Sequence, residues 1–173
     1  GPTTRTDFAR SAGFLAPTAA VVGRSFRHNR PFLFAAVIFL FTDFGADGPY
    51  LAQMQAVLAA QAPGVPCFNL LSNAPASDPR RAAYLLAALA AELPAGSVVV
   101  GVVDPGVGSE RLPIVVEAGG RRFVGPDNGL FSRAAARDRN ARAWRIDWRP
   151  ERLSASFHGR ALFAPVAARL AAA

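Results

Sequence analysis

The sequence has 173 residues, is 51% hydrophobic, and carries a formal net charge of +7. This length allows one domain with a substantial core and leaves no room for two full domains. All 19 basic residues are arginines, but they are scattered or paired, and no aromatic residues interleave with them, which argues against nucleic-acid binding. The longest apolar run is too short to span a membrane, so no membrane partner is expected. Cys67 is the single cysteine, which predicts no intramolecular disulfide and favours a cytoplasmic location.

The first 31 residues differ from the rest of the chain. Residues 1–30 contain five arginines against the single acidic residue Asp7, and they have no sustained period of 2 or 3.6. We predict a disordered or loosely attached leader over residues 1–31 and a folded domain over residues 32–173.

The first half of the domain alternates between apolar runs and helical patterns. Asp78 and Pro79 are typical of a helix N-terminus. The expected elements are a strand over 32–41, a helix over 50–61, a strand over 65–71, a helix over 79–92 and a strand over 97–103. This alternation predicts an α/β domain with parallel strand pairs.

The second half begins with a hairpin signal, because Gly119-Gly120 separates two apolar segments. The expected elements are strands over 113–118 and 121–125, a short helix over 130–138, a strand over 143–148 and a final helix over 162–172. The predicted fold class is therefore α/β, with a mixed, largely parallel central sheet flanked by helices.

Three carboxylates, those of Asp43, Asp104 and Asp127, follow predicted strands. In open α/β sheets, ligands bind at the carboxyl ends of the strands. Asp104 opens a glycine-containing loop, and Arg111 follows seven residues later, close enough to meet that carboxylate. Two readings stay open at this point: an ion pair that only stabilises the loop, or part of an active site. His158, flanked by a glycine, is likewise either a structural histidine or a functional one.

Several common chemistries lack their motifs. The sequence contains no P-loop pattern, no GxGxxG and no GxSxG nucleophile elbow, and Cys67 sits among apolar residues. No metal-ligand spacing is present. What remains is an Asp, Arg and His set that could hold a water beside a bound polar substrate.

Five motifs in order give a specific resemblance over residues 33–173. They are Thr42-Asp43-Phe44-Gly45 with Gly48-Pro49-Tyr50, Val103-Asp104-Pro105-Gly106-Val107-Gly108 with Arg111, Pro126-Asp127-Asn128-Gly129-Leu130, Phe157-His158-Gly159-Arg160, and Phe163-Ala164-Pro165. Together they resemble the S-adenosyl-L-methionine (SAM) hydroxide adenosyltransferases, the SAM hydrolases that are related to the fluorinase and the chlorinase.

The resemblance implies hydrolysis of SAM to adenosine and L-methionine by attack of water or hydroxide on the ribose C5′. It implies SAM as substrate, no cofactor and no metal. Halogenases of this superfamily have an aromatic residue where Asp104 stands, so water is favoured over halide. The implied catalytic residues are Asp104, Arg111 and His158. The implied substrate-binding residues are Asp43, Phe44, Tyr50, Asp127 and Asn128.

Some positions depart from the family pattern. Asn69 and Ser72 stand where the family has an acid and a histidine, and Ala161 stands where it has an aspartate. The family also continues into a β-rich second domain, which is expected to be absent here, and forms a homotrimer when that domain is present. The alternative function is therefore a non-catalytic truncated homologue that binds adenosine-like ligands or needs a partner chain.

Overall fold

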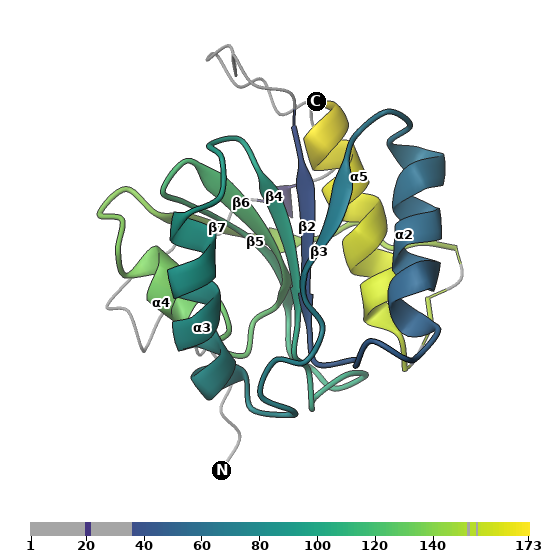
Figure 1. The fold of residues 1–173 in the computed structure, drawn as a ribbon, viewed down its shortest axis with the longest axis horizontal. Coiled ribbons are helices and arrows are strands. Elements are labelled where there is room, and N and C mark those ends of the chain that lie inside the picture. Colours follow the sequence, from purple (N-terminus) through teal and green to yellow (C-terminus); the bar gives the residue numbers. More distant parts are fainter. Residues whose placement is uncertain (1–19, 22–35, 152, 155) are drawn as a thin grey trace.

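One seven-stranded sheet runs through the residues that the computed structural model describes, 20–21, 36–151, 153–154 and 156–173 (Figure 1). The strands are β1 (Ala20–Val21), β2 (Ile38–Thr42), β3 (Cys67–Leu71), β4 (Val98–Val102), β5 (Pro113–Ala118), β6 (Arg121–Pro126) and β7 (Arg142–Ile146). Their order is β1-β7-β5-β6-β4-β2-β3. β5 is antiparallel to β6 and β7, and the other pairs are parallel. The predicted mixed, largely parallel sheet is confirmed.

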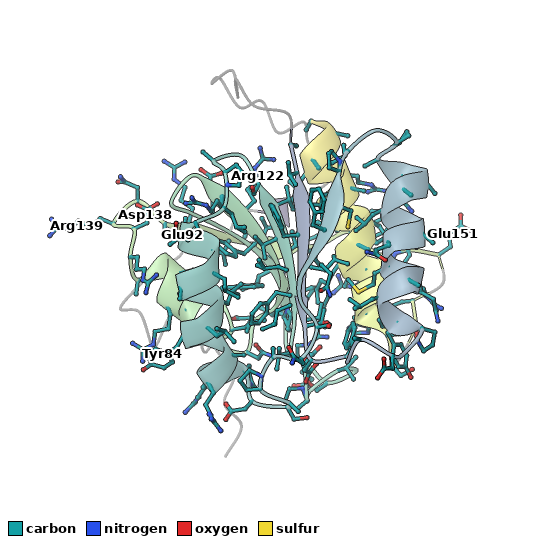
Figure 2. All side chains as sticks on the ribbon, in the orientation of Figure 1. Tyr84, Glu92, Arg122, Asp138, Arg139 and Glu151 are labelled. Atoms are coloured by element: carbon teal, nitrogen blue, oxygen red, sulfur yellow. The ribbon has the colours of Figure 1, made fainter. Side chains whose placement is uncertain are left out.

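Helices cover both faces of the sheet. α2 (Tyr50–Gln61) and α5 (Ala164–Ala172) lie on one face, and α3 (Pro79–Ala91) and α4 (Ser132–Ala135) lie on the other (Figure 1). Successive side chains of a strand point to opposite faces. In β4, Val98, Val100 and Val102 belong to the core beside α2 and α5, whereas Val99 belongs to the core beside α3. Side chains fill both layers (Figure 2). This two-sided burial explains why β4 contains no polar residue.

Two local predictions are confirmed in detail. Asp78 caps α3, because its Oδ1 accepts a hydrogen bond from the Arg81 backbone N–H at 3.0 Å, and Pro79 begins the helix. Gly119 and Gly120 join β5 to β6 with φ of 58° and 73°. A two-residue hairpin turn with positive φ at both positions suits the twist of the strands it joins.

The bounds of several elements differ from the predictions. β2 begins at Ile38, and residues 32–35 of the predicted first strand lie outside the described residues. β3 begins at Cys67 after Pro66, which has no N–H for a sheet ladder. The helix predicted over 130–138 is one turn, Ser132–Ala135, and β7 ends at Ile146.

The final helix starts earlier than predicted and in a different form. A π-helical turn, η1 (Gly159–Phe163), runs directly into α5, and the Ala164 N–H bonds to the Gly159 carbonyl. Pro165, near the start of α5, has no N–H to donate, and in an α-helix its ring would meet the carbonyl four residues back. The wider turn before Pro165 removes this conflict, and π-turns often occur at functional sites.

The predicted leader lies almost wholly outside the described residues. Within it, Ala20–Val21 form β1 and pair in parallel with β7 through Arg145 and Ile146. Among the residues that the structure describes, no helix is long and apolar enough to cross a bilayer.

Candidate active site

The parallel strands deliver polar side chains to one edge of the sheet. Thr42 of β2 pairs with Val102 of β4, so Asp43 and Asp104 follow neighbouring strands at their carboxyl ends. Val103 is fully buried and the loop after it is largely exposed, which places Asp104 where the core meets the surface. The edge predicted from the sequence is therefore the edge at which these carboxylates lie.

Asp104 and Arg111 form a bidentate ion pair. The Arg111 Nε donates to both carboxylate oxygens, at 3.0 and 2.9 Å, and its Nη2 also donates to Oδ2. The Arg111 and Asp104 side chains are only 9% and 4% exposed. A buried guanidinium and carboxylate held in a fork geometry keep a fixed orientation.

His158 completes the cluster from a distant part of the chain. It stands directly before η1, is 8% exposed, and its Nδ1 lies 2.9 Å from Arg111 Nη2. The Phe163 ring packs beneath both groups, with its centroid 5.4 Å from the Arg111 Cζ and 6.4 Å from the His158 ring centroid. Asp104, Arg111 and His158 are therefore brought together, as the resemblance implies.

The contact with Arg111 defines the hydrogen-bonding state of His158. A guanidinium has only donors, so Nδ1 of the imidazole must accept, and the proton of the neutral ring is on Nε2. The basic nitrogen of His158 is thus the one that faces Arg111.

Burial lowers the pKa of His158 below its ordinary value of 6.5. The charge of Arg111 lowers this pKa further and Arg149 acts in the same sense, whereas the carboxylate of Asp104 raises it. The net result is an imidazole that is neutral at pH 7. A neutral imidazole is the form that can accept a proton.

We expect NMR titration of the imidazole protons to give His158 a pKa below 6.5. Arg111→Gln should raise that pKa and Asp104→Asn should lower it, because each removes one of the charges that act on the ring. The chain has one other histidine, His28, so the imidazole signal that disappears in His158→Gln is that of His158. Because the folded pKa is lowered, the stability contributed by neutral His158 is complete above pH 6.5 and is lost as pH falls. A His158 pKa unmoved in both variants would contradict this electrostatic account.

An aromatic group lies beside the cluster. Phe157, the residue before His158, makes edge contacts with Phe44 and Tyr50, with ring centroids 5.6 and 5.2 Å apart. Phe44 and Tyr50 are 5.8 Å apart, and Tyr50 is 48% exposed. The structure therefore packs Phe44 and Tyr50, two of the implied substrate-binding residues, against the residue that precedes His158.

Asp43 holds the loop before α3. Its Oδ2 accepts the Ser77 backbone N–H at 2.9 Å, and Ser77 has a φ of 54°. Within the described residues its Oδ1 accepts no hydrogen bond. Ser72, one of the positions that depart from the family pattern, is buried, and its carbonyl accepts the Gly45 N–H at 2.7 Å.

Asp127 and Asn128 lie in the turn after β6. Asp127 is buried, and its backbone N–H donates to the Leu112 carbonyl at 2.8 Å. The Asn128 Nδ2 donates a hydrogen bond to the Val103 carbonyl at 2.8 Å, and its Oδ1 accepts one from the Leu130 backbone N–H at 3.3 Å. The Asn128 side chain therefore ties this turn to the end of β4, directly before Asp104.

Sequence reasoning did not assign roles to three contacts around the site. Phe163 supports Arg111 and His158, and Phe157 completes the aromatic group. Arg160 stands over the Phe157 ring at 5.3 Å and bonds to Gln53 of α2 at 2.6 Å. The motifs Phe157-His158-Gly159-Arg160 and Phe163-Ala164-Pro165 contain Phe157, Arg160 and Phe163, but the contacts of these residues depend on packing between distant segments. Cys67 is no nucleophile candidate, because burial raises the pKa of its thiol to about 11.

The fold and the cluster define a class of protein: an α/β protein with an Asp-Arg-His site beyond the carboxyl end of a central parallel strand. The family described as SAM hydroxide adenosyltransferase N-terminal domain matches residues 38–173. The chain belongs to this family.

Similar proteins agree with this assignment. The chain is 42% identical to a Thermus thermophilus protein over 78% of this chain and 56% of that protein. It is 45% identical to a Salinispora arenicola protein over 75% of this chain and 51% of that protein. Both are named (R)-S-adenosyl-L-methionine hydrolase. A crystal structure of an uncharacterized conserved protein from Thermotoga maritima, 31% identical, matches 78% of this chain and 53% of its own with a TM-score of 0.75. The chain thus spans about half the length of the relatives it matches.

Proposed function

We propose that this chain carries the catalytic cluster of a SAM hydrolase that forms adenosine and L-methionine. The observation that carries the proposal is the contact of Asp104, Arg111 and His158 at the end of β4. The names of the relatives support the same substrate. SAM enters as substrate, and the proposal includes no cofactor.

The reaction needs an activated water more than a general acid. The water oxygen bonds to C5′ of the ribose as the C5′–S bond breaks. The electron pair of the C5′–S bond leaves with sulfur, which becomes the neutral thioether of methionine. One proton of the water is released. Arg111 supplies positive charge that favours hydroxide over water, and Asp104 orients Arg111. An anion meeting a sulfonium cancels charge, so a dry pocket accelerates the step.

His158 receives the proton in this proposal. Its lowered pKa keeps the ring neutral at pH 7, but its acceptor Nδ1 is bonded to Arg111. The ring must therefore exchange this bond for one to the water before it can act as a base. Arg111 is also bonded to Asp104, so it stays in place when His158 releases it, and only the imidazole has to change its partner.

The substrate would lie between the aromatic group and the strand ends. Phe44 and Tyr50, with Phe157, offer ring faces and edges to an apolar or aromatic part of SAM. The Oδ1 of Asp43 is available to accept a ribose hydroxyl. Asp127 is proposed as a substrate-binding residue on the resemblance alone, and Asn128 as one that acts by holding the end of β4. A homotrimer and a cytoplasmic location also remain proposals.

The test is to incubate the purified chain with SAM and follow adenosine and methionine by chromatography. We expect both products in equal amounts from the parent chain and neither from His158→Gln, with folding checked by circular dichroism. Added chloride or fluoride should not divert the product to a halogenated nucleoside. Adenosine formed equally by His158→Gln would contradict the role of the cluster.

The length of the relatives favours a second candidate function. Because the chain spans about half of them, it could bind an adenosine-like ligand and turn SAM over only together with further chain or a partner. Saturable adenosine binding without product, measured by calorimetry on the same chain, would select this candidate. Robust turnover by the 173-residue chain would exclude it.

A further inference from the structure

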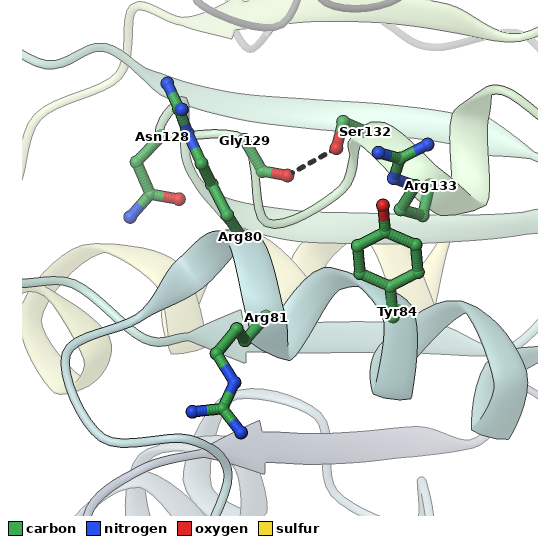
Figure 3. Close-up of a pocket in the computed structure, with 7 residues that line it drawn as sticks. All are labelled: Arg80, Arg81, Tyr84, Asn128, Gly129, Ser132 and Arg133. Atoms are coloured by element: carbon green, nitrogen blue, oxygen red, sulfur yellow. Dashed lines mark hydrogen bonds between the residues drawn. The ribbon is translucent and has the colours of Figure 1, made fainter.

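A pocket lies between α3 and the turn that precedes α4; it includes Asn128, one of the implied substrate-binding residues, but none of Asp104, Arg111 and His158. It has a volume of about 370 Å³, within the usual range of small-molecule sites. Its lining residues are Arg80, Arg81, Tyr84, Asn128, Gly129, Ser132 and Arg133 (Figure 3). The lining contains three cationic side chains and no carboxylate.

Arg80, Arg81 and Arg133 are exposed and give this pocket its positive charge. Within the described residues, no carboxylate lies within ion-pair distance of Arg80, Arg81 or Arg133. Arg80 and Arg81 belong to the first turn of α3, where the helix dipole is itself positive. Asp78 caps the same helix through its Oδ1 and keeps its negative charge, so it offsets part of the positive charge. The three arginines still outnumber this one carboxylate, and their excess charge attracts an anion.

Several donors of the pocket are also available. Arg133 stacks over the Tyr84 ring at 4.3 Å, which orders both side chains. The Tyr84 hydroxyl makes no hydrogen bond within the described residues, and neither do the guanidinium groups of Arg80 and Arg133. The Ser132 Oγ donates to the Gly129 carbonyl at 2.7 Å and so shapes the turn (Figure 3). Arg80 and Arg133 thus bring two guanidinium groups to the wall of one pocket, whereas the Arg81 side chain points away from both (Figure 3).

We propose that this pocket binds a small molecule that carries a diphosphate group. A diphosphate presents several anionic oxygens, which suits guanidinium groups that arrive from two helices together with a phenolic hydroxyl. The pocket shares no residue with the catalytic cluster, although Asn128 links its wall to the Val103 carbonyl, directly before Asp104.

The test measures binding of inorganic pyrophosphate to the full chain by calorimetry at low salt, and needs no turnover. We expect one saturable site, with about tenfold weaker binding in Arg80→Gln and in Arg133→Gln, because each variant removes a charge-assisted contact. Arg139→Gln is the matched control: Arg139 is exposed, points outward beyond the end of α4 (Figure 2), and does not line the pocket. Its binding should equal that of the parent chain.

Four outcomes would overturn the proposal. They are no binding of pyrophosphate, equal weakening in all three variants, binding to oligonucleotides that strengthens with their length and ignores Arg80→Gln, and displacement of pyrophosphate by SAM. The third would indicate a general charge effect, and the fourth would make the pocket part of the substrate site. ADP distinguishes the sources of the diphosphate: binding at least as tight as pyrophosphate assigns a nucleoside diphosphate, and weaker binding assigns the inorganic anion. Both results support the diphosphate site.

Discussion

Gly125→Ala is expected to destabilise the protein by at least about 3 kcal/mol, because the core cannot accommodate one more carbon at this position. A Cβ on Gly125 of β6 would press into the backbone carbonyl of Gly101 on β4 and lie 2.8 Å from the Phe131 Cζ. Backbone of a central strand cannot move aside as a side chain can. Urea unfolding followed by circular dichroism measures the loss.

Two further glycine variants distinguish a steric clash with the backbone from a clash with a side chain. Gly48→Ala is the control, since its Cβ would meet only ordinary contacts, the nearest at 3.5 Å. Gly101→Ala would clash mainly with the Phe131 ring, at 2.7 Å, so Phe131→Leu should partly rescue it. The same replacement should not rescue Gly125→Ala, whose clash with the Gly101 carbonyl remains. Equal urea midpoints for Gly125→Ala and Gly48→Ala would refute the packing argument.

Arg111→Gln is expected to lower kcat for SAM hydrolysis by about two to three orders of magnitude, because it removes the charge that stabilises the nucleophile. It also leaves Asp104 buried without its partner, and breaking a buried pair in this way costs about 3–5 kcal/mol. Loss of activity alone would therefore not distinguish catalysis from unfolding. The measurement pairs steady-state kinetics with urea unfolding for each variant.

The double variant Asp104→Asn/Arg111→Gln resolves this ambiguity. Two neutral amides of similar shape leave no unpaired charge, so stability should return towards that of the parent chain. Activity should stay low, because no positive charge remains beside the water. Arg139→Gln, which removes a charge at an exposed site, should change neither quantity. Activity that recovers together with stability would show that Arg111 is only structural.

Much of the fold was predictable because its signals are local. Uncharged strands, the Asp78 cap and the Gly119-Gly120 turn act through the backbone of a few adjacent residues, and each appears as expected. Element ends were less predictable. The short α4 and the π-turn before Pro165 reflect competition between neighbouring segments that local propensity does not describe.

The sequence by itself determined the alternation of strands and helices, the presentation of Asp104 after a buried strand, and membership of the family through its ordered motifs. Only the tertiary structure decided that His158 meets Arg111 across 47 residues, with Nδ1 as the acceptor. It also decided that Arg80 and Arg133 line one pocket. The physical reason is that backbone preferences act over a few residues, whereas hydrogen-bond states and converging charges depend on which distant segments the packed core brings into contact.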